Sequence, residues 1–242
     1  MLKQVRMHGA GNRFLIGCES ADLGPEAGDD GVLLLSPPRA EGDFYMRIIN
    51  ADGSEGEQCG NGLRCVAMHA VKNGLVEGRE VLVETAAGTV ACVVDLDSAS
   101  VEVDLGIPRL GADACGVTDS GDLPPMTFVD MGNPHAVCLV DESPVSICST
   151  LGPRVADHAG FIRGMNLHVV RMDDAAACTC ATWERGVGPT LSCGTGAASV
   201  FTAAIEAGMC GDALAVTSDG GTLHCRWSPA GSVLVRGPVA YI

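Results

Sequence analysis

Hydrophobic residues along the chain form short runs separated by Gly, Pro and Asp, and most of these runs have the composition of β-strands. Two other segments, 63–73 (LRCVAMHAVKN) and 197–207 (AASVFTAAIEA), are rich in helix-favouring residues and lack proline. Gly74 and Gly208 follow them, at the place where a glycine commonly ends a helix. The strand-like segments are short, rich in β-branched residues and bounded by turn-forming residues: 45–49, 80–84, 90–95, 101–105, 136–140 and 233–236.

The chain repeats itself around the two predicted helices. Each helix follows a C-G-x-G segment, 59–62 (CGNG) or 193–196 (CGTG), and each closing glycine lies fifteen residues after its cysteine. The other matching pairs are Gly11-Asn12 with Gly132-Asn133, and 87–90 (AGTV) with 220–223 (GGTL). An order of strand, C-G-x-G, helix, strand and turn that occurs twice predicts two homologous halves.

We therefore expect an α/β fold of two domains, 1–116 and 117–242, each with several strands around one main helix. The junction is expected in the Gly- and Pro-bearing stretch 106–125. The last residues of the chain would be able to pack back on the N-terminal half.

Composition and charge exclude several classes of function. The formal net charge of −15 argues against a nucleic-acid or anionic-membrane partner, because both require clustered Lys and Arg. No apolar segment is long enough for a membrane helix, and residues 1–8 do not read as a secretory signal, so a cytoplasmic location is expected. The twelve cysteines are then expected as reduced thiols, most of them, such as Cys18, Cys92, Cys138 and Cys225, as small buried hydrophobes.

Cys59 and Cys193 differ from the other cysteines because each stands at the start of a predicted helix. Free backbone N–H groups and the positive end of the helix dipole meet there, which favours the thiolate and lowers the pKa of the thiol. The neighbouring glycines would let the backbone approach a ligand. A thiolate and a thiol on opposite faces of one carbon could invert a stereocentre by removing one proton and returning another.

Neither a cofactor nor a metal is expected. The sequence shows no lysine site for pyridoxal phosphate, and the cysteine spacings at 59/65 and 178/180 (CTC) do not suit zinc.

Together these segments resemble the diaminopimelate epimerase family of cofactor-independent amino-acid racemases. The resemblance lies in 7–12 (MHGAGN), 50–55 (NADGSE) with 59–62 (CGNG), 131–135 (MGNPH), 165–166 (MN), and 184–188 (ERGVG) with 193–196 (CGTG). They span nearly the whole chain in the family's order.

The resemblance implies two similar α/β domains, each a barrel-like, mostly antiparallel sheet around a central helix. It implies Cys59 and Cys193 as the acid/base pair, with His135 and Glu184 beside the reacting centre. It implies substrate binding by nine further residues: Asn12, Asn50, Gly60, Asn61, Asn133, Asn166, Arg185, Gly194 and Thr195. The implied partner is a small amino-acid substrate, L,L- or meso-diaminopimelate of lysine and peptidoglycan synthesis, and the resemblance is compatible with a homodimer.

Three positions and two trimmed regions depart from the usual family pattern. Arg13 stands where an acidic residue is usual, Gly31 where some members have glutamine, and Pro189 where glutamate is frequent. The chain is also shorter between Cys18 and Gly31 and after Pro238, and the substrate is therefore open at this stage.

Three alternative functions remain open, of which only the first keeps the two-thiol chemistry. One is a related racemase of histidine, proline or hydroxyproline; a second is a non-catalytic amino-acid-binding protein; a third is a cysteine-rich redox or zinc protein. The two-thiol hypothesis also predicts that Cys59 and Cys193 can form a disulfide when oxidised without substrate.

Overall fold

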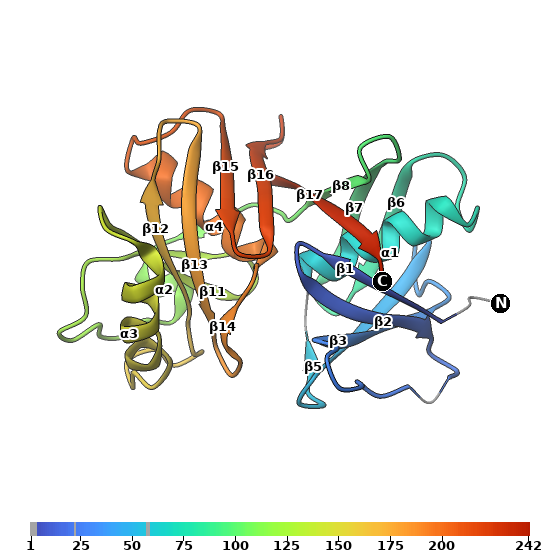
Figure 1. Cartoon of the computed structure of the whole chain (residues 1–242), viewed down its shortest axis with the longest axis horizontal. Helices are drawn as coiled ribbons and strands as arrows, with labels where there is room; N and C mark the ends of the chain where they lie inside the picture. The colour runs from blue at the N-terminus through green and yellow to red at the C-terminus, as the bar shows by residue number, and fades with distance from the viewer. Residues whose placement is uncertain (1–3, 22, 57–58) are drawn as a thin grey trace. The chain divides into compact units, whose positions relative to one another are not determined.

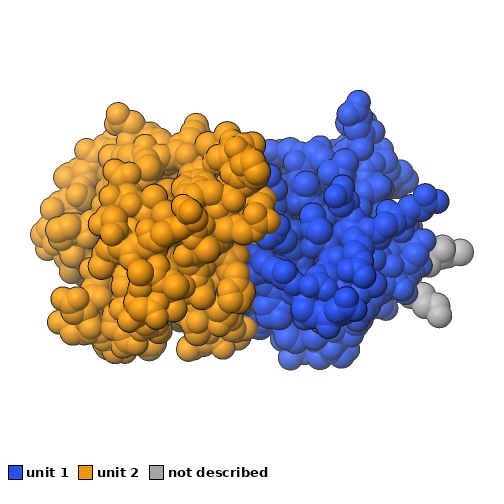
Figure 2. Space-filling view, turned by 90° about the horizontal axis from the view of Figure 1, so that it is seen from above, with its two compact units in different colours: residues 1–104, 236–242 blue, residues 105–235 orange. Residues whose placement is uncertain are grey.

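The computed structural model describes residues 4–21, 23–56 and 59–242, which form two compact units (Figure 2). Unit 1 comprises Met1–Asp104 with Arg236–Ile242, and unit 2 comprises Leu105–Val235. The observed division at 104/105 precedes the expected one at 116/117. The reason is local pairing: β9 (Arg109–Leu110) is antiparallel to β10 (Thr127–Asp130), and α2 (Ala112–Cys115) packs on β10.

The strands of unit 1 close into a ring. Hydrogen-bonded pairing runs β1–β2–β3–β4–β6–β7–β8–β17 and returns from β17 to β1. Closure leaves none of these eight strands with an unpaired edge. The bounds are β1 (Val5–Gly9), β2 (Asn12–Cys18), β3 (Gly31–Ser36), β4 (Phe44–Asn50), β5 (Glu55–Gly56, paired with β4), β6 (Glu80–Thr85), β7 (Gly88–Asp95), β8 (Ser100–Asp104) and β17 (Val233–Tyr241).

The helix of unit 1, α1 (Gly60–Lys72), packs against β1, β2, β6, β7 and β8 (Figure 1). Every residue from Gly60 to Ala70 is buried. Most of these buried residues are apolar or small, and the buried polar residues Asn61 and Arg64 hydrogen-bond to each other.

Unit 2 repeats the same order of pairing. From β10 to β16 the successive pairs are antiparallel, parallel, antiparallel, parallel and antiparallel, as they are from β1 to β7 in unit 1. Its helix α4 (Gly194–Glu206) packs on β10, β11, β12, β15 and β16. The remaining bounds are β11 (Pro134–Leu139), β12 (Asn166–Met172), β13 (Ala177–Glu184), β14 (Gly188–Thr190, paired with β13), β15 (Ala213–Ser218) and β16 (Gly221–Trp227).

The predicted α/β fold with a sheet around a helix in each half is thus confirmed, and both predicted helices are present. Each begins three residues earlier than the composition indicated, because the glycines of C-G-x-G belong to the first helical turn. Among the described residues no helix is both long enough and apolar enough to cross a membrane.

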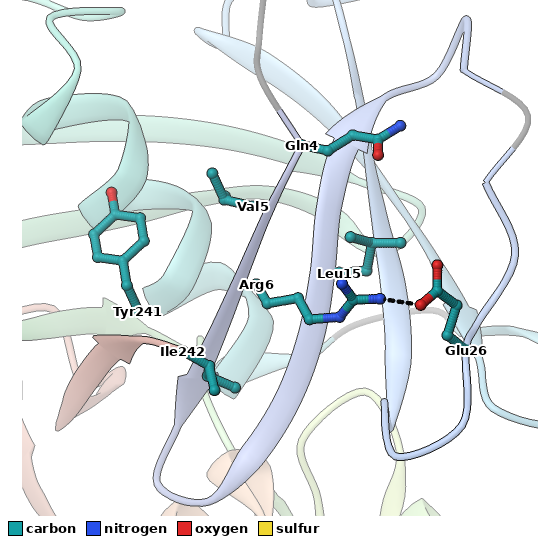
Figure 3. Close-up of a pocket in the computed structure, with 7 residues that line it drawn as sticks. All are labelled: Gln4, Val5, Arg6, Leu15, Glu26, Tyr241 and Ile242. Carbon is teal, nitrogen blue, oxygen red and sulfur yellow. Dashed lines mark hydrogen bonds and ion pairs between the residues drawn. The ribbon is translucent and has the colours of Figure 1, made fainter.

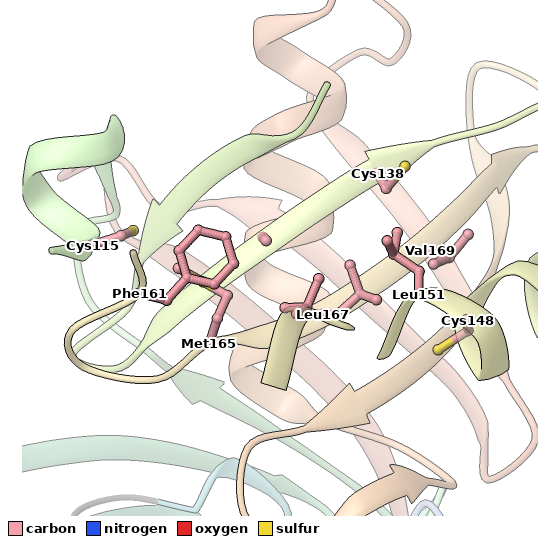
Figure 4. Packing of buried hydrophobic residues seen from close by; sticks show 10 residues of the cluster. Cys115, Cys138, Cys148, Leu151, Phe161, Met165, Leu167 and Val169 are labelled. Carbon is pink, nitrogen blue, oxygen red and sulfur yellow. The ribbon is translucent and has the colours of Figure 1, made fainter. Parts of the chain in front are cut away.

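Unit 2 has one further long helix, α3 (Pro144–Ala156), which packs on β12, β13 and β14 (Figure 1). Its inner side joins a cluster in which three cysteine side chains lie among Leu151, Phe161, Met165 and Leu167 (Figure 4). The composition of α3 does not predict a helix, since its serines, threonine and Pro153 are weak helix formers. Packing of the apolar side stabilises it instead.

Candidate active site

Cys59 and Cys193 occupy the same local geometry in the two units. Each is the N-cap of its helix with an extended backbone, at φ −140° and ψ 103° for Cys59 and φ −130° and ψ 120° for Cys193. In each case Sγ accepts a hydrogen bond from the backbone N–H three residues on, at Gly62 or Gly196, and the distance is 3.3 Å in both. Both cysteines are half-buried, so each combines a hydrogen bond at the helix end with partial exposure to solvent.

This environment stabilises negative charge on sulfur. Neither helix has an acidic residue in its first turn whose negative charge would repel a thiolate. The backbone N–H groups of that turn point at the capping cysteine. The interior cysteines differ sharply, since burial raises the pKa of Cys65, Cys92 and Cys180 each to about 12. Those thiols stay neutral and act as small apolar side chains, as predicted for Cys92, Cys138 and Cys225, whereas Cys18 is half-buried and accepts from Ser20 Oγ at 3.2 Å.

In unit 1 a row of polar side chains leads from inside the barrel to Asn12. Arg64, which is fully buried, donates from Nη2 to Asn61 Oδ1 at 2.6 Å, and Asn61 Nδ2 donates to Asn12 Oδ1 at 3.2 Å. A guanidinium can only donate, so it fixes which end of each amide accepts. The remaining donor of Asn12 is its NH2 group.

Asn50, the last residue of β4, forms its hydrogen bonds with Ser54, four residues further along the chain. Its Nδ2 donates to Ser54 Oγ at 3.0 Å, and its backbone N–H donates to Ser54 O at 2.8 Å. It therefore closes the turn that precedes the Cys59 segment.

In unit 2 the corresponding row contains two histidines; we call Asn133, His135, His168 and Thr182 the histidine chain. His135 Nε2 lies 2.9 Å from Asn133 Oδ1, His135 Nδ1 lies 2.9 Å from His168 Nε2, and His168 Nδ1 lies 3.1 Å from Thr182 Oγ1. Because Asn133 Oδ1 can only accept, His135 Nε2 carries a proton, His168 Nε2 donates to His135 Nδ1, and Thr182 donates to His168.

Both histidines are neutral in this arrangement. Burial first, and electrostatic interaction with His168 and Arg185 second, hold the pKa of His135 well below its usual value. Burial lowers the pKa of His168 to about 3. Neither side chain has any exposed surface. His135 was predicted as a site residue; His168 was not, although it follows Asn166 by two positions and strand alternation places both on one face.

Glu184 and Arg185 lie at the end of β13. Thr190 Oγ1 donates to Glu184 Oε1 at 2.6 Å across the β13–β14 pair, and Arg185 Nη1 donates to Arg163 O at 2.6 Å. Asn166 connects this corner to β11: its Oδ1 accepts from Arg185 N at 3.0 Å and its Nδ2 donates to Pro134 O at 3.2 Å. Both polar ends of the predicted substrate-binding Asn166 are thus bonded to backbone.

The turn before His135 is held by residues that the sequence did not single out. Asp130 is buried and forms ion pairs with Arg109 at 2.7 Å and Arg163 at 2.6 Å. Its other oxygen accepts from Gly132 N at 2.8 Å, and Arg163 Nη2 donates to Gly132 O at 3.2 Å. This cluster fixes the backbone that carries Asn133, and no local sequence signal marks Arg163 as part of it.

The second glycine of each C-G-x-G faces a side chain from the sheet of its own unit. A Cβ on Gly196 would lie 2.2 Å from His168 Cε1, and one on Gly62 would lie 3.0 Å from Leu33 Cδ2. The first glycines, Gly60 and Gly194, begin the helices next to the sulfurs. Thr195 is buried, and its Oγ1 lies 3.6 Å from Cys193 Sγ.

The positions that depart from the usual pattern lie toward the surface or in the sheet. The Arg13 side chain is exposed, while its backbone N–H donates to Asp30 Oδ2 at 2.7 Å. Gly31 pairs with Asn50, where a Cβ would lie 2.8 Å from Ile49 O. Pro189 is exposed on β14.

Among the described residues one group has the atoms to hold a metal ion: His135, His168 and Cys193, whose ligand atoms lie within 4.8 Å of one another. The two rings approach nearly end to end, with centroids 5.1 Å apart and nitrogens 2.9 Å apart. The lone pair of His135 Nδ1 therefore points at the N–H of His168, and this contact is a hydrogen bond.

Unit 1 also has a hollow of about 400 Å³ beside β1, on whose wall Arg6 and Glu26 form an ion pair (Figure 3). None of the residues predicted for the site lines it. Its lining residues are Gln4, Val5, Arg6, Leu15, Glu26, Tyr241 and Ile242.

A model of the family described as diaminopimelate epimerase matches residues 6–111 and 127–242. The chain belongs to this family. Relatives named diaminopimelate epimerase include those of Neisseria meningitidis, 36% identical over 98% of this chain and 95% of the relative, and Geobacillus thermodenitrificans, 35% identical over 97% and 92%. The family consists of isomerases, and this protein is an enzyme of that class.

Solved structures of lower identity share the family's fold. A phenazine biosynthesis protein of the PhzF family from Bacillus anthracis matches with a TM-score of 0.72 and 16% identity, covering 100% of this chain and 98% of that one. A hydroxyproline epimerase from Agrobacterium vitis matches with a TM-score of 0.71 and 17% identity, covering 99% and 90%. At these identities the likeness concerns the fold alone.

Proposed function

We propose that the protein interconverts L,L- and meso-diaminopimelate without a cofactor, using Cys59 and Cys193 as the acid/base pair. The observation that carries the proposal is the matched pair of N-cap cysteines, each accepting a backbone N–H at 3.3 Å. Membership of the family and relatives of 33–36% identity that bear this enzyme's name support the choice of substrate.

In the proposed reaction one cysteine thiolate removes the α-proton and becomes a thiol, leaving the electron pair on the α-carbon. The other cysteine donates its proton to the opposite face and becomes a thiolate, so no net proton is consumed. The carboxylate beside that carbon would be bound by N–H groups at the starts of α1 and α4, where Gly60, Asn61, Gly194 and Thr195 lie.

The other predicted residues would bind the remaining polar groups of the substrate. Asn12 and Asn133 would present amide donors, and Arg185 would pair with a carboxylate. Glu184 would hold the α-amino group, and His135 would act through Asn133, whose Oδ1 lies 2.9 Å from His135 Nε2. Asn50 and Asn166 would act mainly through the turns they fix. The role in lysine and peptidoglycan synthesis, the cytoplasmic location, the homodimer and the Cys59–Cys193 disulfide remain predictions.

The deciding measurement is exchange of the α-hydrogen with solvent deuterium. The purified protein, reduced and without added cofactor, should introduce deuterium at the α-carbon of diaminopimelate while the diastereomers equilibrate. Histidine, proline and hydroxyproline are assayed beside it by circular dichroism. Turnover of one of these with none of diaminopimelate would replace the proposed substrate. Absence of exchange with all four amino acids would rule out racemisation as the function.

Cysteine variants test the mechanism separately from the substrate. Cys59→Ala and Cys193→Ala should each lower the racemisation rate by about 10³-fold, the scale of a lost general acid or base. Ligand binding should remain measurable by calorimetry. Cys210→Ala is the matched control, since Cys210 is half-buried and follows α4 but caps no helix. Normal turnover in either N-cap variant would contradict the two-thiol mechanism.

A further inference from the structure

The internal repeat allows each buried residue of the histidine chain to be compared with its counterpart in the other half. The second glycines of the two C-G-x-G segments give the anchor, because Gly62 faces Leu33 and Gly196 faces His168. The strands carrying these two residues, β3 and β12, have the same neighbours in the two pairing orders. Leu33 and His168 are therefore equivalent positions.

Strand register extends the comparison to the neighbouring strands. Ile48 is the β4 partner of Leu33, and Thr182 is the β13 partner of His168. On the other side, Phe14 pairs with the residue two before Leu33, and His135 pairs with the residue two before His168. Unit 1 thus has Phe14, Leu33 and Ile48 where unit 2 has His135, His168 and Thr182.

All six of these side chains are buried, with exposed fractions of 0–5%. The fold therefore accepts an apolar set at these positions and does not require a polar one. Burying two imidazoles and a hydroxyl stabilises a protein less than burying hydrocarbon of similar volume, even when every hydrogen bond is made. The polar set in unit 2 is consistent with selection for what it does at the site.

The direction of the hydrogen bonds in the histidine chain indicates what the chain does. Protons are donated from Thr182 through His168 and His135 to Asn133 Oδ1, which leaves the NH2 of Asn133 as its donor. In unit 1 the donors Arg64 and Asn61 leave Asn12 in the same state. Both rows end at the asparagine that follows the glycine of the β1–β2 or β10–β11 turn.

We propose that His168 is a positioning residue: by donating to His135 Nδ1 it fixes the tautomer of His135 and, through it, the orientation of the Asn133 amide. The role in isomerisation rests on the function proposed above. The tautomer itself does not, since it follows from the chain of contacts.

Two substitutions of His168 separate positioning from packing. His168→Leu installs the residue that unit 1 uses at this position, whereas His168→Gln keeps a side-chain N–H that can donate to His135. If His168 only fills space, the leucine variant should be the more active. If it positions His135, the glutamine variant should keep most of the activity, and the leucine variant should lose roughly tenfold or more in kcat/KM, as misplaced tautomers do.

The pH profile gives a second readout that packing alone would not change. Without a donor at Nδ1, His135 in His168→Leu can take up a proton there, so the rate should fall on the acid side at a pH where the wild type and His168→Gln are unaffected. An active leucine variant with the wild-type pH profile would overturn the proposal.

Nitrogen-15 NMR of the wild-type imidazoles tests the tautomer without any turnover and without any variant that must fold. His135 should be protonated at Nε2 only, and its pKa should lie well below the usual range of histidine because the ring is buried. Protonation at Nδ1 would overturn the proposal. A correct tautomer in a protein that does not exchange diaminopimelate would instead count against the proposed function.

Discussion

At the residue scale, the twelve cysteines show how surroundings decide chemistry. Eight are buried, and burial raises the pKa of Cys148 to about 11 in the cluster of Figure 4. Cys59 and Cys193 have the same side chain but cap helices. Reactivity is therefore expected at these two cysteines because each sulfur accepts a backbone N–H at the start of a helix.

Another residue governed by backbone N–H groups is Glu84. Its carboxylate accepts from the backbone N–H of Arg39 at 2.6 Å and from those of Ala40 and Gly42 at 2.8 Å each. These bonds hold the pKa of Glu84 below its ordinary value. They tie the segment before β4 to β6.

A pH-dependent loss of stability follows from Glu84. Its folded pKa lies below its unfolded pKa, so the stabilisation is complete above the unfolded value, about 4.3, and is lost as pH falls through the folded value. Glu84→Gln should lower the free energy of unfolding at pH 7, and its difference from wild type should shrink below about pH 4. Urea unfolding of both proteins across this pH range measures it; a difference that stays constant with pH would contradict the carboxylate's role.

At the scale of elements, α1 and α4 are thirteen-residue helices that are both capped by cysteine but pack on different strand side chains. Leu33 lies under the first turn of α1 and His168 under that of α4. Both helices have a glycine at the third position, where a strand side chain packs against the helix backbone. The glycines of this motif thus set the distance between helix and sheet.

Alanine at these two glycines should have unequal effects. Alanine favours a helix over glycine by about 1 kcal/mol, and at Gly62 a Cβ would need Leu33 to shift by only a few tenths of an ångström. At Gly196 the Cβ would lie 2.2 Å from the His168 ring, an overlap that costs about 1–3 kcal/mol. Thermal unfolding should place Gly196→Ala below wild type and Gly62→Ala near it. Equal melting temperatures for the two variants would contradict the packing argument.

At the scale of the whole molecule, the C-terminal strand β17 contributes residues to both units. β17 begins in unit 2, and its residues 236–241 lie between β1 and β8 in the ring of unit 1. Its backbone N–H at Val239 donates to Ala99 O, and Arg236 donates to Ser100 Oγ at 2.7 Å. The first and last strands of the chain thus pair with each other.

Removal of residues 236–242 should open the ring of unit 1 and leave unit 2 folded. Backbone amides of β1 and β8 should then exchange with deuterium faster, because their partner strand is missing, while β11, β12 and β13 keep their protection. Hydrogen exchange followed by mass spectrometry measures this, with removal of Ile242 alone as the control. Uniform loss of protection in both units would show that they do not unfold separately.

The sequence alone determined what is local or repeated. Glycine placement and helix-favouring composition gave α1 and α4, and the doubled C-G-x-G gave two equivalent halves and the cysteine pair, because N-caps and helix ends depend on neighbouring residues. The predicted site residues His135, Asn61 and Asn133 do lie in hydrogen-bonded rows with their own half's helix or strands.

Tertiary structure decided what depends on strand register and burial. No local pattern reveals that Leu33 and His168 are equivalent, that Asp130 binds Arg163, or that β17 completes the first unit, because these contacts join residues far apart in sequence. Helix α3 likewise exists through its packing and not through its propensity. The sequence therefore specified the two cysteines, and register between strands decided which buried side chains support each one.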